Sequence, residues 1–216
     1  MASMVVWHTR RVTYASVPPA RPGEPGTHLV IIRGNSGSGK TSVAREVRRR
    51  YGRGCALIEQ DQMRRIVLGE HDTRYIERVA PGFITHSAAY ALAHGYHVVL
   101  EGVMAASRYR EELTALIDGH PGRSSVFYLD IPFEETARRH QTKPEAAEVT
   151  VEQIREWYEP HDLLGVDGEY VIGEVSTFEE SVHTVLTLSG LDTVAALSGC
   201  PNACPRCQAE LAATPA

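Results

Sequence analysis

The stretch that decides the fold reads LVIIRGNSGSGKT and runs from Leu29 to Thr41. Its first four residues are a continuous apolar run, which predicts a strand buried on both faces of a sheet. A glycine-rich turn follows at residues 34–39. Beyond it, apolar residues recur every four positions from Val43 to Tyr51 with arginines between them, which predicts an amphipathic helix. The segment therefore predicts a strand, a tight turn and a helix, one directly after another.

The turn fits the pattern G-x-x-x-x-G-K-[ST] at every position, and it lies in the strand–turn–helix setting that this pattern requires. Glycines allow the backbone angles that fold a loop around an anion, and the loop N–H groups with the helix N-terminus point at a β-phosphate. Lys40 places a positive charge at the β- and γ-phosphate oxygens, and Thr41 offers a hydroxyl to Mg²⁺. A glycine-rich turn that binds nothing is the alternative. The candidate nucleotide-binding residues are Gly34, Asn35, Ser36, Gly37, Ser38, Gly39, Lys40 and Thr41.

Length, charge and hydropathy exclude several classes of protein. The chain has 216 residues, which suits one compact domain with a real hydrophobic core. Its 22 basic and 27 acidic residues give a net charge of −5, which argues against a protein that coats nucleic acid through bulk charge. No apolar run approaches the roughly 18 residues that span a bilayer, and we expect a cytoplasmic protein with no membrane partner. Neither Asn35 nor Asn202, the only asparagines, precedes a lysine, so the N-K-x-D motif of guanine-specific GTPases is absent.

Apolar runs and helical periodicity continue along the chain. Predicted strands lie at residues 56–58, 97–100, 126–131 and 170–172, and predicted helices at residues 63–68, 72–95, 107–117, 133–142, 151–158 and 176–189. We expect the helix at 72–95 to be interrupted at Pro81-Gly82. Ser176 and Glu179 have the capping-box pattern that opens the last helix. Strands that alternate with helices predict a parallel sheet with helices on both faces. We expect an extended leader at 1–27, one domain at 28–190 and a small cysteine-containing tail at 191–216.

These residues resemble the small P-loop kinases, that is, the nucleoside-monophosphate-kinase-like group and within it the chloramphenicol phosphotransferase, zeta-toxin and polynucleotide 5′-kinase type. The resemblance covers about Leu29 to Leu188 and is most specific at Gly34–Thr41. It implies an α/β P-loop NTPase fold, a three-layer sandwich whose five-stranded parallel sheet has the phosphate-loop strand at its centre, with a short lid. It also implies ATP with Mg²⁺ as the phosphoryl donor and a hydroxyl group as the acceptor.

Acidic residues follow the second predicted strand. In the kinases that the chain resembles, an aspartate just beyond this strand faces the acceptor hydroxyl, and Asp61 matches that position. The chemistry is sound on its own, because the carboxyl ends of parallel strands open into the ligand crevice, where a carboxylate can orient or deprotonate a hydroxyl. A surface or helix-capping aspartate is the alternative, and Glu59 is the second candidate base. Arg64 and Arg65 either hold an anionic part of the acceptor or lie on a solvated helix face.

Glu101 ends the third predicted strand after an apolar run, as in a Walker B element. It is a candidate for holding the water shell of Mg²⁺ together with Thr41, or for contacting the acceptor. An acid that merely ends a strand is the alternative. Gly102 would then let substrate approach closely, and Arg108 and Arg110 are further candidates for lining the acceptor site.

Residues 132–144 lie where the kinases that the chain resembles carry a lid, which supplies cations to the transferred phosphoryl group. Arg139 and Lys143 are four positions apart and share a helical face, so we predict a catalytic role for Arg139 and nucleotide contacts for Lys143, which stands where those kinases usually have a second arginine. Arg138 points about 100° away and is a candidate for stacking on adenine. Charge on an exposed helix is the alternative for all three. Trp157-Tyr158 either walls a binding pocket or belongs to an aromatic core cluster.

Three cysteines near the C-terminus, Cys200, Cys204 and Cys207, have C-x₃-C-x₂-C spacing. Radical SAM enzymes use this spacing near the start of a barrel roughly 200 residues long, and only nine residues remain here. A zinc knuckle needs a fourth ligand, for which His183 is a poor candidate. Free thiols in a tail are the simplest interpretation.

Three functions fit these residues. The first is an ATP-dependent phosphotransferase that moves the γ-phosphoryl group of ATP to a hydroxyl of a small molecule such as a metabolite, nucleoside or antibiotic. The second is a polynucleotide 5′-hydroxyl kinase, which the net charge of −5 disfavours. The third is a non-catalytic ATP-binding regulatory protein. The residues favour the first function, but they name neither the acceptor nor the oligomeric state.

Overall fold

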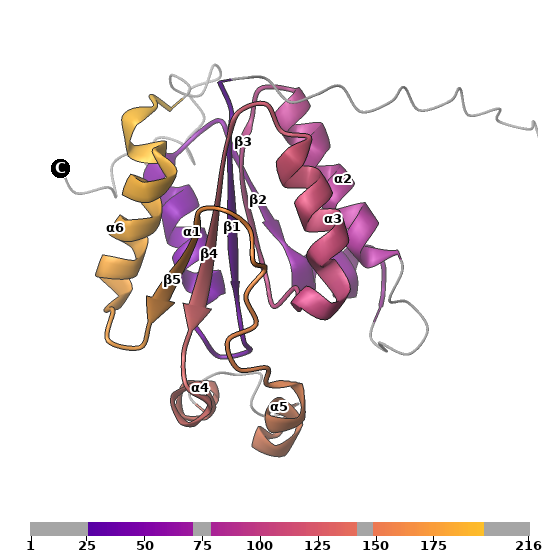
Figure 1. Ribbon diagram of the computed structural model, residues 1–216, viewed down its shortest axis with the longest axis vertical. Coiled ribbons are helices and arrows are strands. Elements are labelled where there is room, and N and C mark those ends of the chain that lie inside the picture. The colour runs from indigo at the N-terminus through magenta and orange to yellow at the C-terminus, as the bar shows by residue number, and fades with distance from the viewer. Residues whose placement is uncertain (1–25, 71–78, 142–148, 197–216) are drawn as a thin grey trace, which may run out of the picture.

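Five parallel strands form the centre of the molecule (Figure 1). The computed structural model describes residues 26–70, 79–141 and 149–196. Across the sheet the strand order is β2-β3-β1-β4-β5, so the predicted five-stranded parallel sheet with the phosphate-loop strand at its centre is confirmed. The strands are β1 (His28–Gly34), β2 (Cys55–Glu59), β3 (His97–Gly102), β4 (Arg123–Asp130) and β5 (Glu169–Gly173).

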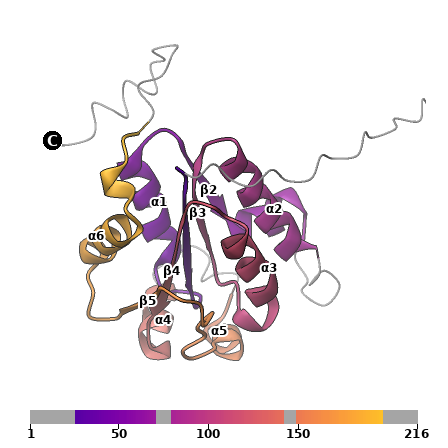
Figure 2. The ribbon, with the colours of Figure 1, turned by 45° about the horizontal axis from the view of Figure 1, so that its top comes forward.

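Helices cover both faces of the sheet, with α1 and α6 on one face and α2 and α3 on the other (Figures 1 and 2). The α-helices are α1 (Lys40–Tyr51), α2 (Ala80–Ala93), α3 (Ala106–Asp118), α4 (Phe133–His140), α5 (Val151–Trp157) and α6 (Phe178–Ser189). Two short helical segments, η1 (Gln62–Val67) and η3 (Leu191–Thr193), complete the described elements. The predicted three-layer α/β sandwich is therefore confirmed. Among the described residues, no helix is both long and apolar enough to cross a membrane.

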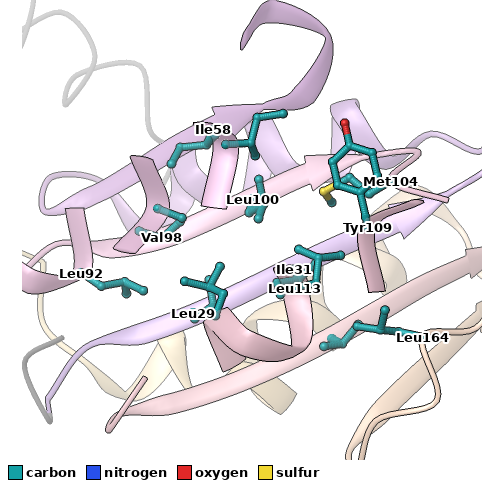
Figure 3. Packing of buried hydrophobic residues seen from close by; sticks show 14 of the residues in the cluster. Leu29, Ile31, Ile58, Leu92, Val98, Leu100, Met104, Tyr109, Leu113 and Leu164 are labelled. Carbon is teal, nitrogen blue, oxygen red and sulfur yellow. The ribbon is translucent and has the colours of Figure 1, made fainter. Parts of the chain in front are cut away.

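The central strand β1 is buried on both sides, as its apolar run predicts. Leu29 and Ile31 pack with residues of α2 and α3, and Figure 3 shows this cluster around them. Val30 and Ile32 belong to the cluster on the other face, with residues of α1 and α6. All four side chains have no exposed surface. Because burial of apolar area is the main favourable term in folding, the strand that leads into the phosphate loop has a rigid base.

Strand register places the predicted functional residues at one edge of the sheet. Ile32 of β1 is opposite Glu101 of β3, and Glu101 is in turn opposite Glu59 of β2. The carboxyl ends of these strands therefore meet at the same edge, where ligands bind in open parallel sheets. The helices α4 and α5 lie beyond this edge, at the bottom of Figure 1.

The structure places the starts of two predicted helices more exactly. Pro81 and Gly82 lie in the first turn of α2, which begins at Ala80, because the missing N–H of proline has no partner to lose in a first turn. Residues 72–78 of the helix predicted at 72–95 lie outside the described residues. The capping box of α6 uses Thr177 and Glu180, with Thr177 Oγ1 accepting from Glu180 N at 3.2 Å. The sequence STFEE fits the capping-box pattern in two registers, and the structure adopts the later one.

Candidate active site

Glycines shape the phosphate loop at positions where a side chain would collide with its surroundings. Gly37 has φ +85°, and a Cβ there would lie 2.6 Å from the carbonyl oxygen of Thr136 in α4. Gly34 ends β1, and a Cβ there would lie 2.8 Å from the carbonyl oxygen of Leu129 in β4. The loop is therefore packed tightly between the end of the sheet and α4, and positions 34 and 37 have room only for glycine.

The two predicted magnesium residues are in direct contact. Thr41 Oγ1 donates a hydrogen bond to Glu101 Oε2 at 3.0 Å, and Glu101 is only 3% exposed. The pKa of Glu101 is raised overall, because the effect of burial is larger than the opposing effects of the Lys40 ammonium and the Thr41 hydrogen bond. Lys40 Nζ is also close to the loop, 3.5 Å from the carbonyl oxygen of Asn35. The structure thus brings together the two residues that the sequence predicts for magnesium.

Arg139 reaches from α4 to the phosphate loop. Its Nη1 donates to the carbonyl oxygen of Ser38 at 3.0 Å, and its Nε donates to Glu135 Oε1 at 2.6 Å. Arg138 also binds Glu135, with both carboxylate oxygens engaged, but its side chain is 68% exposed. The hydrogen bond from Arg138, which has the largest effect, and the hydrogen bond from Arg139 lower the pKa of Glu135 to about 2. Arg139 thus contacts the phosphate loop, whereas Lys143 lies outside the described residues.

A cavity of about 500 Å³ opens beside the phosphate loop. Its lining includes loop residues and four predicted acceptor residues, together with side chains from α3, from the end of α5 and from the segment after α5. These lining residues include Gly34, Asn35, Ser36, Asp61, Arg64, Arg65, Arg108, Tyr109, Trp157, Glu159 and Asp162. Asp61 is well exposed, and its Oδ1 lies 3.7 Å from Arg65 Nε. The loop and the predicted acceptor residues therefore share one cavity.

Asp61 and Glu59, the two candidate bases, have different surroundings. Arg45 of α1 binds both carboxylate oxygens of Glu59, at 2.5 and 2.8 Å. An arginine held in this bidentate way occupies both oxygens of the carboxylate. Asp61 lines the cavity, so it is the better placed of the two to meet an acceptor hydroxyl.

The space in front of Gly102 does not admit substrate, contrary to the sequence prediction. A Cβ on Gly102 would lie 2.5 Å from Gln60 Cβ, so the side chain of Gln60 fills that space. Gln60 is buried, and it donates to Tyr109 OH at 2.8 Å and accepts from Met104 N at 3.2 Å. Gly102 is therefore needed for packing between the ends of β2 and β3, which the strand-end pattern alone does not reveal.

Arg33, the penultimate residue of β1, is a fully buried arginine that was not among the sequence-predicted site residues. Its guanidinium donates to Asp162 Oδ2 at 2.7 Å and to the carbonyl oxygen of Met104 from both Nε and Nη2, at 3.0 and 2.9 Å. A second carboxylate, Glu169 Oε1, lies 3.4 Å from its Nη1. A single arginine at the end of an apolar strand was the available signal, because such a charge must find buried partners.

The remaining aromatic and arginine candidates separate in the structure. Trp157 is half-exposed and lines the cavity, whereas Tyr158 packs on Phe133 and donates to the carbonyl oxygen of Ile131 at 3.1 Å. Trp157 thus lines a pocket, whereas Tyr158 belongs to an aromatic cluster. Arg108 lines the cavity. Arg110 instead donates to the carbonyl oxygens of Leu163 and Leu164, so it braces a loop rather than the acceptor site.

The interpretation of Cys200, Cys204 and Cys207 as free thiols stays a prediction, because these cysteines lie outside the described residues. Within the described ranges, no group of three histidine, cysteine or acidic residues could hold a metal ion by itself.

The sheet order, the phosphate loop and the lid helices together define a kinase-like P-loop fold. Residues 29–163 match the family described as AAA domain, and the chain belongs to this family. The resemblance to small P-loop kinases is thereby confirmed at the level of fold.

Solved structures with this fold are named as kinases of small molecules. The APS kinase of Mycobacterium tuberculosis, in complex with AMPPNP and APS, has a TM-score of 0.57 and 21% identity, over 76% of this chain and 98% of that one. A sugar kinase from Janibacter sp. has a TM-score of 0.62 and 19% identity, over 79% and 99%. A gluconokinase from Sinorhizobium meliloti has a TM-score of 0.52 and 20% identity, over 79% and 94%. No curated protein matches the sequence.

Proposed function

We propose that the protein is an ATP-dependent phosphotransferase that moves the γ-phosphoryl group of ATP to a hydroxyl of a small-molecule acceptor. The observation that carries this proposal is the shared cavity, whose lining runs from loop residues 34–36 to Asp61, Arg64 and Arg65. A phosphate loop that adjoins an acceptor cavity holds donor and acceptor side by side, and phosphoryl transfer depends on such positioning.

The loop supplies the donor site. Its main-chain N–H groups and Lys40 would bind the β- and γ-phosphate oxygens. The hydroxyl of Ser38 is buried in the loop without a hydrogen-bond partner among the described residues, which leaves it available to a phosphate oxygen. Thr41 Oγ1 and Glu101 provide the hard oxygen atoms that Mg²⁺ prefers, Thr41 as a direct ligand and Glu101 through the water shell. When bound, Mg²⁺ neutralises charge on the polyphosphate.

Asp61 and Arg139 act on the two sides of the transferred group. Asp61 orients the acceptor hydroxyl and accepts its proton as the acceptor oxygen forms a bond to the γ-phosphorus. The bond between the γ-phosphorus and the bridging oxygen breaks, and that oxygen leaves with the electron pair as part of ADP. Lys40 and Arg139 balance the negative charge that builds on the phosphoryl oxygens.

We propose a small acceptor that carries an anionic group, which would bind the arginines of a lining that also includes Asp61, Glu70, Glu159 and Asp162. Arg64, Arg65 and Arg108 line it, and guanidinium groups bind carboxylate, sulfate or phosphate in bidentate fashion. Trp157 adds an apolar surface. A cavity of about 500 Å³ suits a metabolite. The sugar, gluconate and APS kinases that share the fold are named for acceptors of this size.

The function is tested by incubating the protein with ATP, Mg²⁺ and a panel of hydroxyl compounds: sugar acids, sugar phosphates, nucleosides and antibiotics. Phosphorylation of one member gives a mass gain of about 80 Da, and we expect anionic members to be the best acceptors. Lys40→Ala is the control and should abolish the gain. Tight ATP binding with no transfer to any member would instead support a regulatory nucleotide-binding protein.

A further inference from the structure

Asn35, the second residue of the phosphate loop, turns its side chain toward the segment after α5. Its Nδ2 donates to the carbonyl oxygen of Glu159 at 2.8 Å, and its Oδ1 accepts from Glu159 N at 3.1 Å. Both polar ends of one side chain thus pair with the main chain of one residue. Asn35 is only 4% exposed, so these hydrogen bonds are shielded from water and hold a fixed geometry.

The same segment is fastened at two further points. Tyr128 OH accepts from Asn35 Nδ2 and from Asp162 N, each at 3.2 Å, and lies 3.3 Å from the carbonyl oxygen of Glu159. Burial raises the pKa of Tyr128 to about 12, so its hydroxyl stays protonated and can donate. Arg33 binds the carbonyl oxygen of Asp162 at 2.9 Å. Residues 159–162 are therefore held by β1, β4 and the phosphate loop together.

This segment forms one wall of the acceptor cavity. Trp157, Glu159 and Asp162 line it beside loop residues 34–36. Asp162 also accepts two hydrogen bonds from Ala106 N at the start of α3, at 3.1 and 3.0 Å. The position of the wall is thus set from the loop on one side and from α3 on the other. Among the described loop side chains, Asn35 is the one that hydrogen-bonds to this wall.

We propose that Asn35 is a positioning residue that couples nucleotide binding to the shape of the acceptor cavity. The proposal rests on the function proposed above. A phosphate bound to the loop N–H groups restrains the loop, and the paired hydrogen bonds extend that restraint to Glu159 and so to Trp157 and Asp162. Because coupling between two sites is reciprocal, an acceptor that rests on this wall tightens nucleotide binding by the same factor. Serine or alanine at position 35 could not make both hydrogen bonds to Glu159.

The coupling is tested by amide hydrogen exchange of residues 157–163, with and without saturating AMPPNP and Mg²⁺. In the wild-type protein we expect nucleotide to slow this exchange by about fivefold. In Asn35→Ala we expect the slowing by nucleotide to fall below about 1.5-fold, although the loop itself remains protected. A purely structural role would speed exchange equally in both states and leave the nucleotide-dependent ratio unchanged.

Arg110→Met is the matched control. Arg110 braces the same stretch of chain through Leu163 and Leu164, but it does so from α3. In this variant, residues 157–163 should exchange faster both with and without nucleotide. The nucleotide-dependent ratio of the exchange rates should stay at the wild-type value. Tyr128→Phe is the second test variant, because it leaves the loop sequence intact and removes the hydroxyl shared by Asn35, Glu159 and Asp162. The slowing of exchange by nucleotide should fall in Tyr128→Phe as well. If Asn35→Ala does not fold, Tyr128→Phe takes its place as the test of the coupling.

The outcomes separate the two proposals. Absence of protection at residues 34–41 in the wild-type protein would mean that nucleotide does not bind the loop, and both proposals would fail. Protection at 34–41 without any slowing at 157–163 would overturn only the coupling. A wild-type ratio in Asn35→Ala, or in Tyr128→Phe where the first variant does not fold, would also overturn it.

Discussion

At the scale of single residues, two carboxylates and one buried arginine near the cavity differ in what their side chains contact. Asp61 lines the cavity and is well exposed, whereas Glu59 is bound by Arg45. Arg33 has no exposed surface and holds the floor of the site through Asp162 and Met104. Residue type alone does not distinguish these roles, but the partners of each side chain do.

Asp61→Asn should keep nucleotide binding and lose the chemical step. The amide cannot accept the proton of the acceptor hydroxyl, so transfer should fall by about 10²–10⁴-fold. The measurement is the transfer rate to the best acceptor of the panel, beside the ATP dissociation constant. Glu59→Gln is the matched control and should transfer within about twofold of wild type, because it breaks only a pair with an exposed arginine. Full turnover by Asp61→Asn would remove the assigned base.

Arg33→Met should destabilise the fold more than the loss of a surface ion pair. It leaves Asp162 and Glu169, which are 13% and 6% exposed, without their shared cation. We expect a loss of about 3 kcal/mol in the free energy of unfolding, measured by urea titration. Arg50→Met is the control, since Arg50 also binds two carboxylates but at the surface, and it should cost less than about 1 kcal/mol. Equal losses would show that the Arg33 cluster is not effectively buried.

At the scale of elements, the ends of β2 and β3 are joined by one side chain. Gln60 lies against Gly102 and links to Tyr109 of α3 and to Met104. This packing aligns β2, which ends two residues before Asp61, with β3, which contains Glu101. The relative positions of Asp61 and Glu101 therefore depend on a contact between neighbouring strands rather than on either strand alone.

Alanine substitutions at two glycines test this packing. Gly102→Ala should destabilise the protein by about 1–3 kcal/mol, because its Cβ would overlap Gln60. Gly82→Ala should instead stabilise it by about 0.5–1 kcal/mol, because it meets nothing within 4 Å and replaces glycine in a helix. Thermal or urea unfolding of both variants checks the signs. A neutral Gly102→Ala would mean that Gln60 has room to move.

The elements were largely predictable, because hydrophobic periodicity reports burial directly. The run at 29–32 predicted the central strand, and the residues from Val43 to Tyr51 predicted α1. The start of α6 was placed one residue early, because STFEE contains two capping boxes. Hydrogen-bond energy at a helix start is local, and sequence pattern cannot choose between two registers that satisfy it equally.

The site was only partly predictable. A phosphate loop is recognised because its chemistry fixes consecutive residues, so residues 34–41 could be selected from the sequence. Arg33 and the role of Gly102 could not, because their partners come from positions 60, 104 and 162, which only the folded chain brings together. The pairing of Asn35 with Glu159 spans 124 positions and has no sequence signal of its own.

At the scale of the whole molecule, the edge of the sheet opposite the site carries buried histidines. His97 Nδ1 accepts from His28 N at 2.9 Å. His120 lies between Thr27 Oγ1 and Ser124 Oγ, at 2.9 Å from each. Burial lowers the pKa of both His97 and His120, and the charges of neighbouring histidines add to this effect. The folded state therefore resists protonation at this edge.

Stability should fall as the pH is lowered below about 6.5. The unfolded chain takes up protons near the ordinary histidine pKa of 6.5, whereas His97 and His120 in the folded chain do so only at lower pH. The stability that the neutral forms of His97 and His120 contribute is fully present above pH 6.5, and it is lost as the pH falls toward the lower pKa of these residues in the folded chain. Urea midpoints at pH 7.5 and 5.5 measure the change. His120→Gln should reduce it, and His86→Gln, which alters an exposed helix residue, should not.

The proposed phosphotransferase activity requires that the phosphate loop binds a nucleoside triphosphate, and a calorimetric titration with ATP and Mg²⁺ tests this most directly. We predict saturable binding to one site per chain and a loss of that binding in Lys40→Ala. If neither ATP nor GTP gave heat or raised the melting temperature with Mg²⁺ present, the phosphotransferase account would be contradicted.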